Sequence, residues 1–301
     1  MKHSRLLMSA AVCGLLAVGS SVHAQKTPLS PVTPTKENRI RLMTSDNQIT
    51  AFFYKKPVVL DKEQHKGLRL KAADARFAAK NQSVPMVLAE FPEASLEYPI
   101  VFAKSQDSQW IALALTGLQA DSNAFVDESG RWTGRYVPAS VRRYPFILAE
   151  GENKQLSLAV DMDAPQLGSE GEALFDDKGE PTELVRNVMN MMGEFQSQAL
   201  STGTLAKELD DAKLLTQQSL RVQLGDGRNA VVDGVWIVDE AKLRELSDDK
   251  ILSLYKSGAL VAIHAHMLSL RNLLPLLERS QPAAADAKAD KKPSNNRKDK
   301  S

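Results

Sequence analysis

The first half of the chain consists of short apolar runs separated by clusters of turn-forming residues. Ser105–Ser108, Asp127–Gly130 and Gly151–Asn153 are such clusters, rich in Gly, Asn, Asp and Ser. Because the runs between them are too short for most helices, the pattern predicts a meandering antiparallel sheet. Ala72–Lys80 is the segment of this half that best fits a helical period. The expected strands are Ala51–Tyr54, Val58–Leu60, Leu68–Leu70, Val84–Glu90, Ile100–Lys104, Trp110–Thr116, Ala124–Asp127, Pro145–Ala149 and Leu156–Val160.

The second half changes to a helical period. A stripe of apolar residues follows Pro181, which suits the first turn of a helix. Ser201–Gly203 should end this helix and separate it from a second one. Gly225–Gly227 lies between two apolar runs, so Arg221–Val238 is predicted to form a β-hairpin. The apolar positions of the two helices are Leu184, Val185, Val188, Met191, Met192, Phe195 and Leu200, then Leu205, Leu209, Leu214 and Leu215.

Three further helices are expected before residue 280. Asp239 can cap a helix over Glu240–Leu246, and Ser247 can cap one over Asp248–Lys256. Ala259–Leu277 is largely apolar, so we expect it to be a helix that is buried for most of its length.

The two periods together predict an α+β fold, in which an N-terminal antiparallel β-sheet or partial barrel packs with C-terminal helices. Residues 51–165 would form the β-rich region and residues 166–279 the helical region, with the hairpin near 221–238. This body is long enough for one large domain or two small ones of ~100–150 residues each.

The N-terminal residues have the pattern of a cleavable export signal. A short basic segment precedes the apolar run Leu6–Gly19, and Val22–Ala24 offers small residues at the positions that signal peptidase requires, so cleavage is expected between Ala24 and Gln25. The apolar run is shorter than the ~20 residues of a membrane-spanning helix, which argues against an uncleaved anchor.

The mature chain should therefore be exported to the periplasm, the cell surface or the medium. No later stretch reads as long and apolar enough to span a membrane, so no transmembrane segment is expected after cleavage. Residues 25–50 begin with a Pro-rich segment and are expected to form an extended linker. Residues 280–301 have no apolar period and are expected to be a disordered tail, with six basic residues against three acidic ones.

Cysteine content and charge exclude several classes of function. The only cysteine, Cys13, lies within the predicted signal, so the mature chain can form no disulfide, thiolate metal site or cysteine nucleophile. Cleavage removes Lys2 and Arg5 from 38 basic residues and none of the 37 acidic ones, which leaves a net charge of 36 − 37 = −1. A balance this close to neutral gives no reason to expect nucleic acid binding.

Few residues suggest catalysis or metal binding. His264 and His266 are weak metal candidates, because a spacing of two residues on a helix points the side chains to different faces. No Gly-x-Ser-x-Gly motif occurs, and the acids at Asp161–Asp163 and Asp176–Asp177 lack the spacing of a calcium loop. We assign no catalytic residues and expect no cofactor.

Aromatic and arginine residues form the most distinctive cluster. They could make a surface that stacks on a sugar or a peptide. The competing interpretation, favoured for a segment this apolar, is a core of aromatic side chains. If Arg142 and Arg143 lie on a strand, their side chains face opposite ways, so one would reach solvent and the other would pair with an acid such as Glu172. The candidate binding residues are Trp110, Trp132, Tyr136, Arg142, Arg143 and Tyr144.

Several ordered motifs resemble the SapC family of bacterial proteins, named for a surface-layer-associated member. The resemblance runs from about Tyr54 to Leu274 and brings no established catalytic residues. The motifs are Tyr98–Phe102, Phe125–Asp127 with Gly130–Trp132, Tyr136–Pro138, Arg142–Phe146, Glu172–Asp176, Val238–Leu243 and Ala265–Leu270.

The resemblance implies a role at the bacterial cell envelope or surface layer. We expect an exported, non-enzymatic protein whose partner is an envelope component such as a glycan or a peptide. The alternative is an envelope enzyme or an accessory to ligand uptake, with its site in a pocket between sheet and helices. That alternative requires His264 or His266 beside a carboxylate within hydrogen-bond reach.

Overall fold

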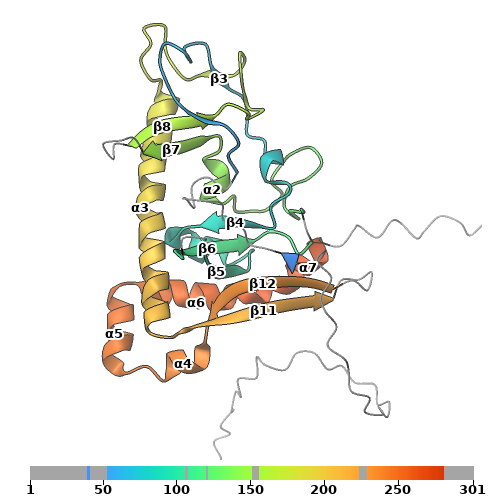
Figure 1. The fold of residues 1–301 in the computed structure, drawn as a ribbon, viewed down its shortest axis with the longest axis vertical. Helices are drawn as coiled ribbons and strands as arrows, with labels where there is room; N and C mark the ends of the chain where they lie inside the picture. The colour runs from blue at the N-terminus through green and yellow to red at the C-terminus, as the bar shows by residue number, and fades with distance from the viewer. Residues whose placement is uncertain are drawn as a thin grey trace, which may run out of the picture. The chain divides into compact units, whose positions relative to one another are not determined.

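The computed structural model describes residues 39–40, 53–105, 108–119, 121–150, 156–223 and 229–280, all within the compact unit Lys36–Ser301. The predicted signal peptide, most of the linker, the turn Gly225–Gly227 and the tail beyond Ser280 lie outside the described residues. The described part is α+β, as predicted, with open sheets and several helices (Figure 1).

The main sheet combines strands from both halves of the chain. Its order is β1–β12–β5–β6–β4, and β11 also pairs with β12. All pairs are antiparallel except β1 with β12. Every residue of β6 is buried, which accounts for its continuous apolar run. The bounds are β1 Arg39–Ile40, β4 Ser83–Met86, β5 Ile100–Lys104, β6 Trp110–Leu115, β11 Leu215–Gln223 and β12 Asn229–Val238.

Two smaller antiparallel sheets lie beside a second core of buried apolar residues. One has the order β2–β8–β7 and the other β10–β3–β9. The bounds are β2 Pro57–Val59, β3 Arg69–Leu70, β7 Phe146–Glu150, β8 Leu156–Asp161, β9 Leu167–Gly168 and β10 Glu172–Ala173.

Short helical turns replace parts of two predicted strands. The expected strand Val84–Glu90 ends at Met86, and η3 (Leu88–Glu90) and α1 (Phe91–Ala94) follow it. The expected strand Ala124–Asp127 is reduced to one bridge, between Val126 and Trp132. The helical period of Ala72–Lys80 produces only η2 (Arg76–Ala78).

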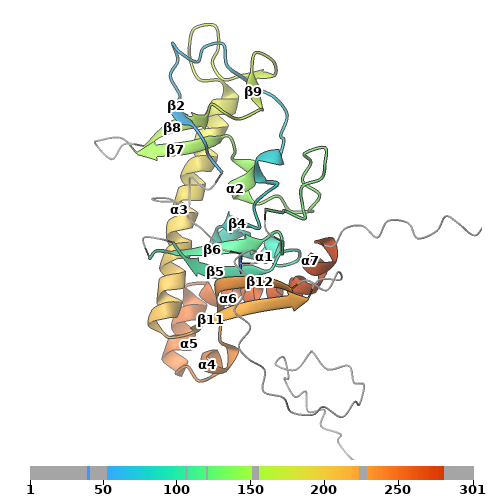
Figure 2. The ribbon, with the colours of Figure 1, turned by 45° about the vertical axis from the view of Figure 1, so that its right-hand side comes forward.

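The longest helix, α3 (Glu183–Asp211), connects the two cores. Val188 and Met192 pack into the core of the smaller sheets, whereas Leu205 and Leu209 pack into the core of the main sheet. Figure 2 shows β7 and β8 beside one part of α3 and β6 beside another.

The predicted break of this helix at Ser201–Gly203 was wrong. The Thr202 hydroxyl donates to the Gln198 carbonyl at 2.7 Å and accepts the Leu88 N–H at 2.8 Å. Threonine side chains often compete with the backbone hydrogen bonds of a helix, but the hydroxyl of Thr202 has both a donor and an acceptor as partners within α3 and η3. Thr202 therefore continues the helix and joins it to η3.

The C-terminal helices follow the predicted hairpin β11–β12. They are α4 (Glu240–Arg244), α5 (Asp248–Lys256), α6 (Ala259–Ser269), η4 (Leu270–Asn272) and α7 (Leu273–Arg279). The predicted cap of α4 is confirmed, since the Asp239 carboxylate accepts the Ala241 and Lys242 N–H groups. Ser247 occupies the N-cap position of α5 without a side-chain hydrogen bond.

The last helical stretch is half exposed and not mostly buried as expected. By length and composition alone, Ala259–Arg279 is long and apolar enough to cross a membrane, and 39% of its most apolar part is buried. The prediction that no stretch beyond the signal reaches this length and hydropathy was wrong. Its inner face packs on the main sheet (Figure 1 and Figure 2), and core helices of soluble proteins also have such composition.

His266 joins α6 to the two halves of the main sheet. Its Nε2 accepts the Val238 N–H of β12 at 3.0 Å, and its Nδ1 lies 2.9 Å from the Ile100 carbonyl of β5. The imidazole is therefore neutral, with its proton on Nδ1. Complete burial lowers the pKa of His266 to about 4.

We expect His266 to make the fold sensitive to acid. The unfolded chain binds a proton near pH 6.5 and the folded chain near pH 4, so stability is complete above 6.5 and falls as the pH drops through this window. The expected loss is about 3 kcal/mol, from the shift in pKa. Urea unfolding at several pH values would measure it.

His266→Gln is the matched variant, because an amide can donate and accept without titrating. Its unfolding free energy should fall less steeply than that of the wild type between pH 6.5 and about 4. Equal slopes for the two proteins would contradict the role assigned to His266.

Candidate functional site

The predicted aromatic and arginine cluster is divided among three groups of contacts. Trp110 lies in β6 and contacts α3, whereas Trp132 and Tyr136 lie in the segment before α2 (Ala139–Arg142). Arg142 is the last residue of α2 and Arg143 its C-cap, so the prediction that the two arginines lie on a strand was wrong. Pro138 occupies the N-cap position of this short helix.

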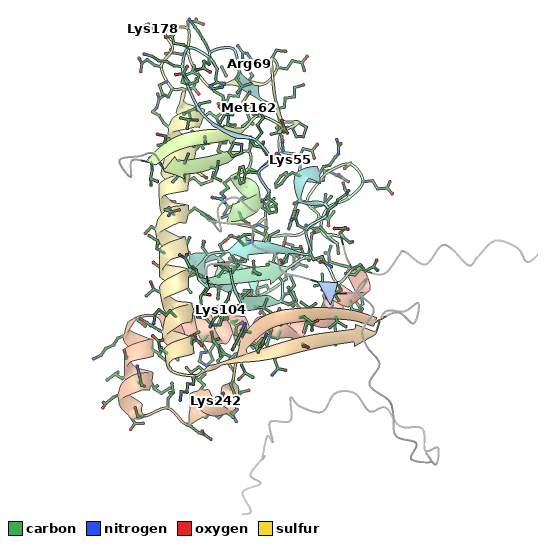
Figure 3. All side chains as sticks on the ribbon, in the orientation of Figure 1. Lys55, Arg69, Lys104, Met162, Lys178 and Lys242 are labelled. Carbon is green, nitrogen blue, oxygen red and sulfur yellow. The ribbon has the colours of Figure 1, made fainter. Side chains whose placement is uncertain are left out.

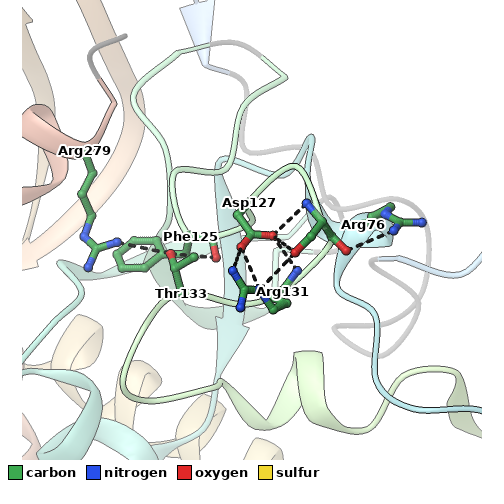
Figure 4. A network of polar contacts seen from close by, with 7 residues as sticks. Arg76, Phe125, Asp127, Arg131, Thr133 and Arg279 are labelled. Atoms are coloured by element: carbon green, nitrogen blue, oxygen red, sulfur yellow. Dashed lines mark hydrogen bonds and ion pairs between the residues drawn. The ribbon is translucent and has the colours of Figure 1, made fainter. Parts of the chain in front are cut away.

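Trp132 belongs to a packed group of rings. Its indole N–H donates to the Tyr98 hydroxyl at 2.9 Å, and its ring stacks on Phe125 with centroids 5.9 Å apart. Figure 4 shows Arg279 of α7 beside Phe125 and Thr133, and its guanidinium carbon lies 4.7 Å from the Phe125 ring centre. Trp132 therefore packs the segment after β6 against the body of the fold.

The adjoining turn is also held by its own side chains. The Asp127 carboxylate accepts the Ser129 hydroxyl at 2.6 Å and pairs with Arg131 at 3.0 Å (Figure 4). The hydrogen bond from Ser129, followed by the one from the Arg131 backbone, lowers the pKa of Asp127 to about 2. The predicted turn at Asp127–Gly130 is confirmed, and Gly130 has the positive φ of 83° that favours glycine.

Tyr136 is bonded to a buried carboxylate that sequence reasoning missed. Its hydroxyl donates to Glu90 at 2.8 Å, and the same carboxylate accepts the N–H groups of Val87 at 2.9 Å and Ala139 at 2.6 Å. Burial raises the pKa of Glu90, while these hydrogen bonds act in the opposite direction. Arg142 is exposed, and its guanidinium lies 5.9 Å from the Tyr136 ring.

Arg143 and Tyr144 lie in a second buried polar group. The Tyr144 hydroxyl donates to Asp161 at 3.1 Å, and Asp161 also accepts the N–H groups of Lys55 and Lys56. Burial raises the pKa of Tyr54, which donates to the Phe146 carbonyl, to about 12.

Burial lowers the pKa of Arg143, which is 2% exposed. Its guanidinium carbon lies 4.3 Å from the Phe195 ring centre and 5.7 Å from that of Tyr54. Glu172, the predicted acidic partner, is an exposed residue of β10. These contacts place Arg143 in the interior of the fold.

Trp110 borders a groove between the β5–β6 region and α3, with a volume of about 530 Å³. Its indole N–H donates to Asp210 at 3.2 Å, and Asp210 also pairs with Lys104 at 3.3 Å. The Lys104 ammonium lies 4.5 Å from the Trp110 ring centre and 5.4 Å from that of Trp236. The adjacent strand β6, the distant hairpin β11–β12 and the distant helix α3 thus all contact one lysine.

The rest of the groove is lined mainly by polar side chains of α3. Lys207 pairs with Asp211 at 2.6 Å, although most of the exposed surface of the groove is apolar. Both partners of each ion pair are partly exposed, so these groups are accessible to a ligand. The additional lining residues are Ser108, Gln109, Gln196, Ala199, Leu200, Gly203 and Thr204.

The structure does not bring the two candidate histidines together for metal binding. His264 is exposed, and its Nδ1 lies 2.7 Å from the Leu260 carbonyl of its own helix. Both ring nitrogens of His266 are engaged by backbone groups. Among the described residues, no group of three or more His, Cys, Asp or Glu is placed to hold a metal ion.

We expect Trp132→Ala to lower the free energy of unfolding by about 3 kcal/mol, because it removes a stacked ring and a hydrogen bond. Trp132→Phe should cost less, since the ring contact survives. Tyr255→Ala is the control, because Tyr255 is 70% exposed and its removal should cost less than about 0.5 kcal/mol. Urea unfolding would rank the three, and an unchanged stability for Trp132→Ala would contradict the packing role.

Comparison with protein families gives a match over most of the body of the chain. Residues 60–276 match the SapC family, which is most of the chain and nearly all of its described body. No curated protein and no solved structure matches. The chain belongs to the SapC family.

Proposed function

We propose that this chain is an exported protein that associates with the bacterial cell envelope or surface layer by binding a glycan in the groove beside Lys104. The proposal combines membership of the SapC family, the export pattern of residues 1–24 and the geometry of the groove. The carrying observation is the pairing of Lys104 and Asp210 within an accessible groove that offers both polar and apolar surface.

The groove has the chemistry that a polyhydroxylated ligand requires. Each sugar hydroxyl both donates and accepts hydrogen bonds, so a glycan site needs donors and acceptors side by side. Lys104 with Asp210 and Lys207 with Asp211 provide two such pairs. The side-chain amides of Gln109 and Gln196 each add a donor and an acceptor.

The placement of the buried titratable groups supports a role for them in the fold and binding without their catalysis. An acid or base needs a free position directed at the substrate. Both nitrogens of His266 bond to the chain itself, and Glu90 and Asp161 accept hydrogen bonds from neighbouring backbone groups. In this arrangement they serve the fold.

We expect Lys104→Ala with Lys207→Ala to weaken binding to protein-free envelope polysaccharide by about tenfold or more, which corresponds to ~1.4 kcal/mol. Lys178→Ala is the matched control, since Figure 3 places Lys178 at the opposite end of α3 from Lys104. Co-sedimentation with the polysaccharide would measure affinity, and thermal unfolding would confirm that all variants fold.

Two results would overturn the glycan proposal. One is equal binding by the wild type and the Lys104 and Lys207 double variant. The other is binding to envelope extract that survives periodate oxidation of sugars and is abolished by protease, because the ligand would then be a peptide.

The export part of the proposal has a separate test. Cell fractionation followed by mass measurement of the intact protein should find a chain that begins at Gln25 outside the cytoplasm. A chain lacking residues 1–24 is the control and should stay in the cytoplasm. Full-length protein retained in the cytoplasm would show that the segment is no export signal.

A further inference from the structure

The outer face of the last helical stretch exposes large apolar side chains, with the exposed His264 and Arg271 between them. Val261 is 64% exposed, Leu268 59% and Leu274 62%. The opposite face is buried against the main sheet, where Ile263 and His266 are almost inaccessible. Isolated exposed apolar residues are common, but three on the outer side of one continuous helical stretch form a surface that needs an explanation.

The middle of this surface carries only basic charges, whereas the exposed acids Asp248, Asp249 and Glu278 lie near the start of α5 and the end of α7. From Lys250 to Leu277 the sequence contains Lys250, Lys256 and Arg271 and no Asp or Glu, although a quarter of the whole chain is charged. All three basic side chains are exposed. The neighbouring helix α5 adds the exposed Tyr255, a residue type that favours the membrane–water boundary.

We propose that this face of α5–α7 docks on an anionic lipid surface. The apolar side chains would enter the boundary between headgroups and acyl chains, and the basic side chains would contact lipid phosphates. The tail after Ser280 carries six basic residues against three acidic ones in residues 280–301, which would add to the attraction. This function is distinct from glycan binding in the groove.

The inner face indicates that the stretch lies on the membrane and does not cross it. Ser269 accepts the Ile100 N–H at 2.9 Å, and Asn272 donates to the Ser95 carbonyl at 2.7 Å. His266 adds its two bonds to the sheet. Crossing a bilayer would break these bonds and carry the same polar groups into hydrocarbon.

A second copy of the chain fits this face less well than lipid does. A symmetric contact between two copies would bring like surfaces together. A symmetric contact centred on Lys256 and Arg271 would therefore bring like cations together. Anionic lipid supplies the opposite charge that the middle of the surface lacks.

The test is co-sedimentation of the mature chain, residues 25–301, with phosphatidylglycerol vesicles and with phosphatidylcholine vesicles. We expect binding to the first alone, weakening as salt is added. Leu268→Gln with Leu274→Gln should weaken binding about tenfold or more, and Lys256→Glu with Arg271→Glu should do the same. Leu156→Gln with Lys178→Glu is the matched control, from exposed positions on other elements.

Removal of the tail after Ser280 distinguishes attraction by the basic tail from attraction by the face of α5–α7. We expect the shortened chain to bind more weakly and to remain sensitive to the Leu268 and Leu274 changes. The proposal is overturned if the tail alone accounts for binding and the apolar variants bind like the wild type. It is also overturned if the apolar variants abolish a dimer in solution while the wild type ignores both kinds of vesicle.

Discussion

The main sheet depends on one neutral imidazole. Strands β5 and β12 come from opposite halves of the chain and are in register at Phe102 and Trp236. Two residues further along this register, Ile100 and Val238 are joined through His266. Because a cationic imidazole has no acceptor for the Val238 N–H, the sheet selects the neutral form. Burial of the ring beside Phe102, at a centroid distance of 5.0 Å, adds to this selection. Helix packing, strand pairing and the protonation state of one residue are therefore parts of a single constraint.

The groove follows from that arrangement and from the length of α3. One end of α3 packs on the smaller sheets, so its position beside β6 is fixed by contacts far from the groove. Asp210 then meets Trp110 of β6, and the β11–β12 hairpin brings Trp236 to the same lysine. Lys104 loses freedom because two rings and a carboxylate surround it. A preorganised lysine loses less entropy on binding than a free one, which favours recognition at this position.

Local patterns predicted those elements that local interactions determine. The bounds of Ile100–Lys104 and the cap at Asp239 follow from neighbouring residues, and both were predicted correctly. The local residue types of Ser201–Gly203 predicted a break in the helix. The prediction failed because Thr202 accepts a hydrogen bond from the Leu88 N–H, which is distant in sequence and leaves no local signal. The same limit applies to the site: Trp110 was a candidate, but its partners Asp210 and Lys104 carried no signal of their own. The aromatic cluster was visible in the sequence, whereas the hydrogen bond that directs Trp132 inward, to Tyr98, was not.

Shifted pKa values often mark catalytic groups. In this chain, the hydrogen-bond partners of the buried groups indicate that the shifts arise from the fold instead. A catalytic group combines a shifted pKa with an atom directed into a cavity. The ring nitrogens of His266 and the carboxylate oxygens of Glu90 all have partners within the chain. The Tyr54 hydroxyl donates to the Phe146 carbonyl in the same way. Burial shifts the pKa values of these three groups, and their hydrogen bonds hold helices and strands together. The shifts are therefore a consequence of packing in the fold. Accessible charges in the groove and around the last helices have no such role in the core, and they suit recognition of a polar ligand or an anionic surface.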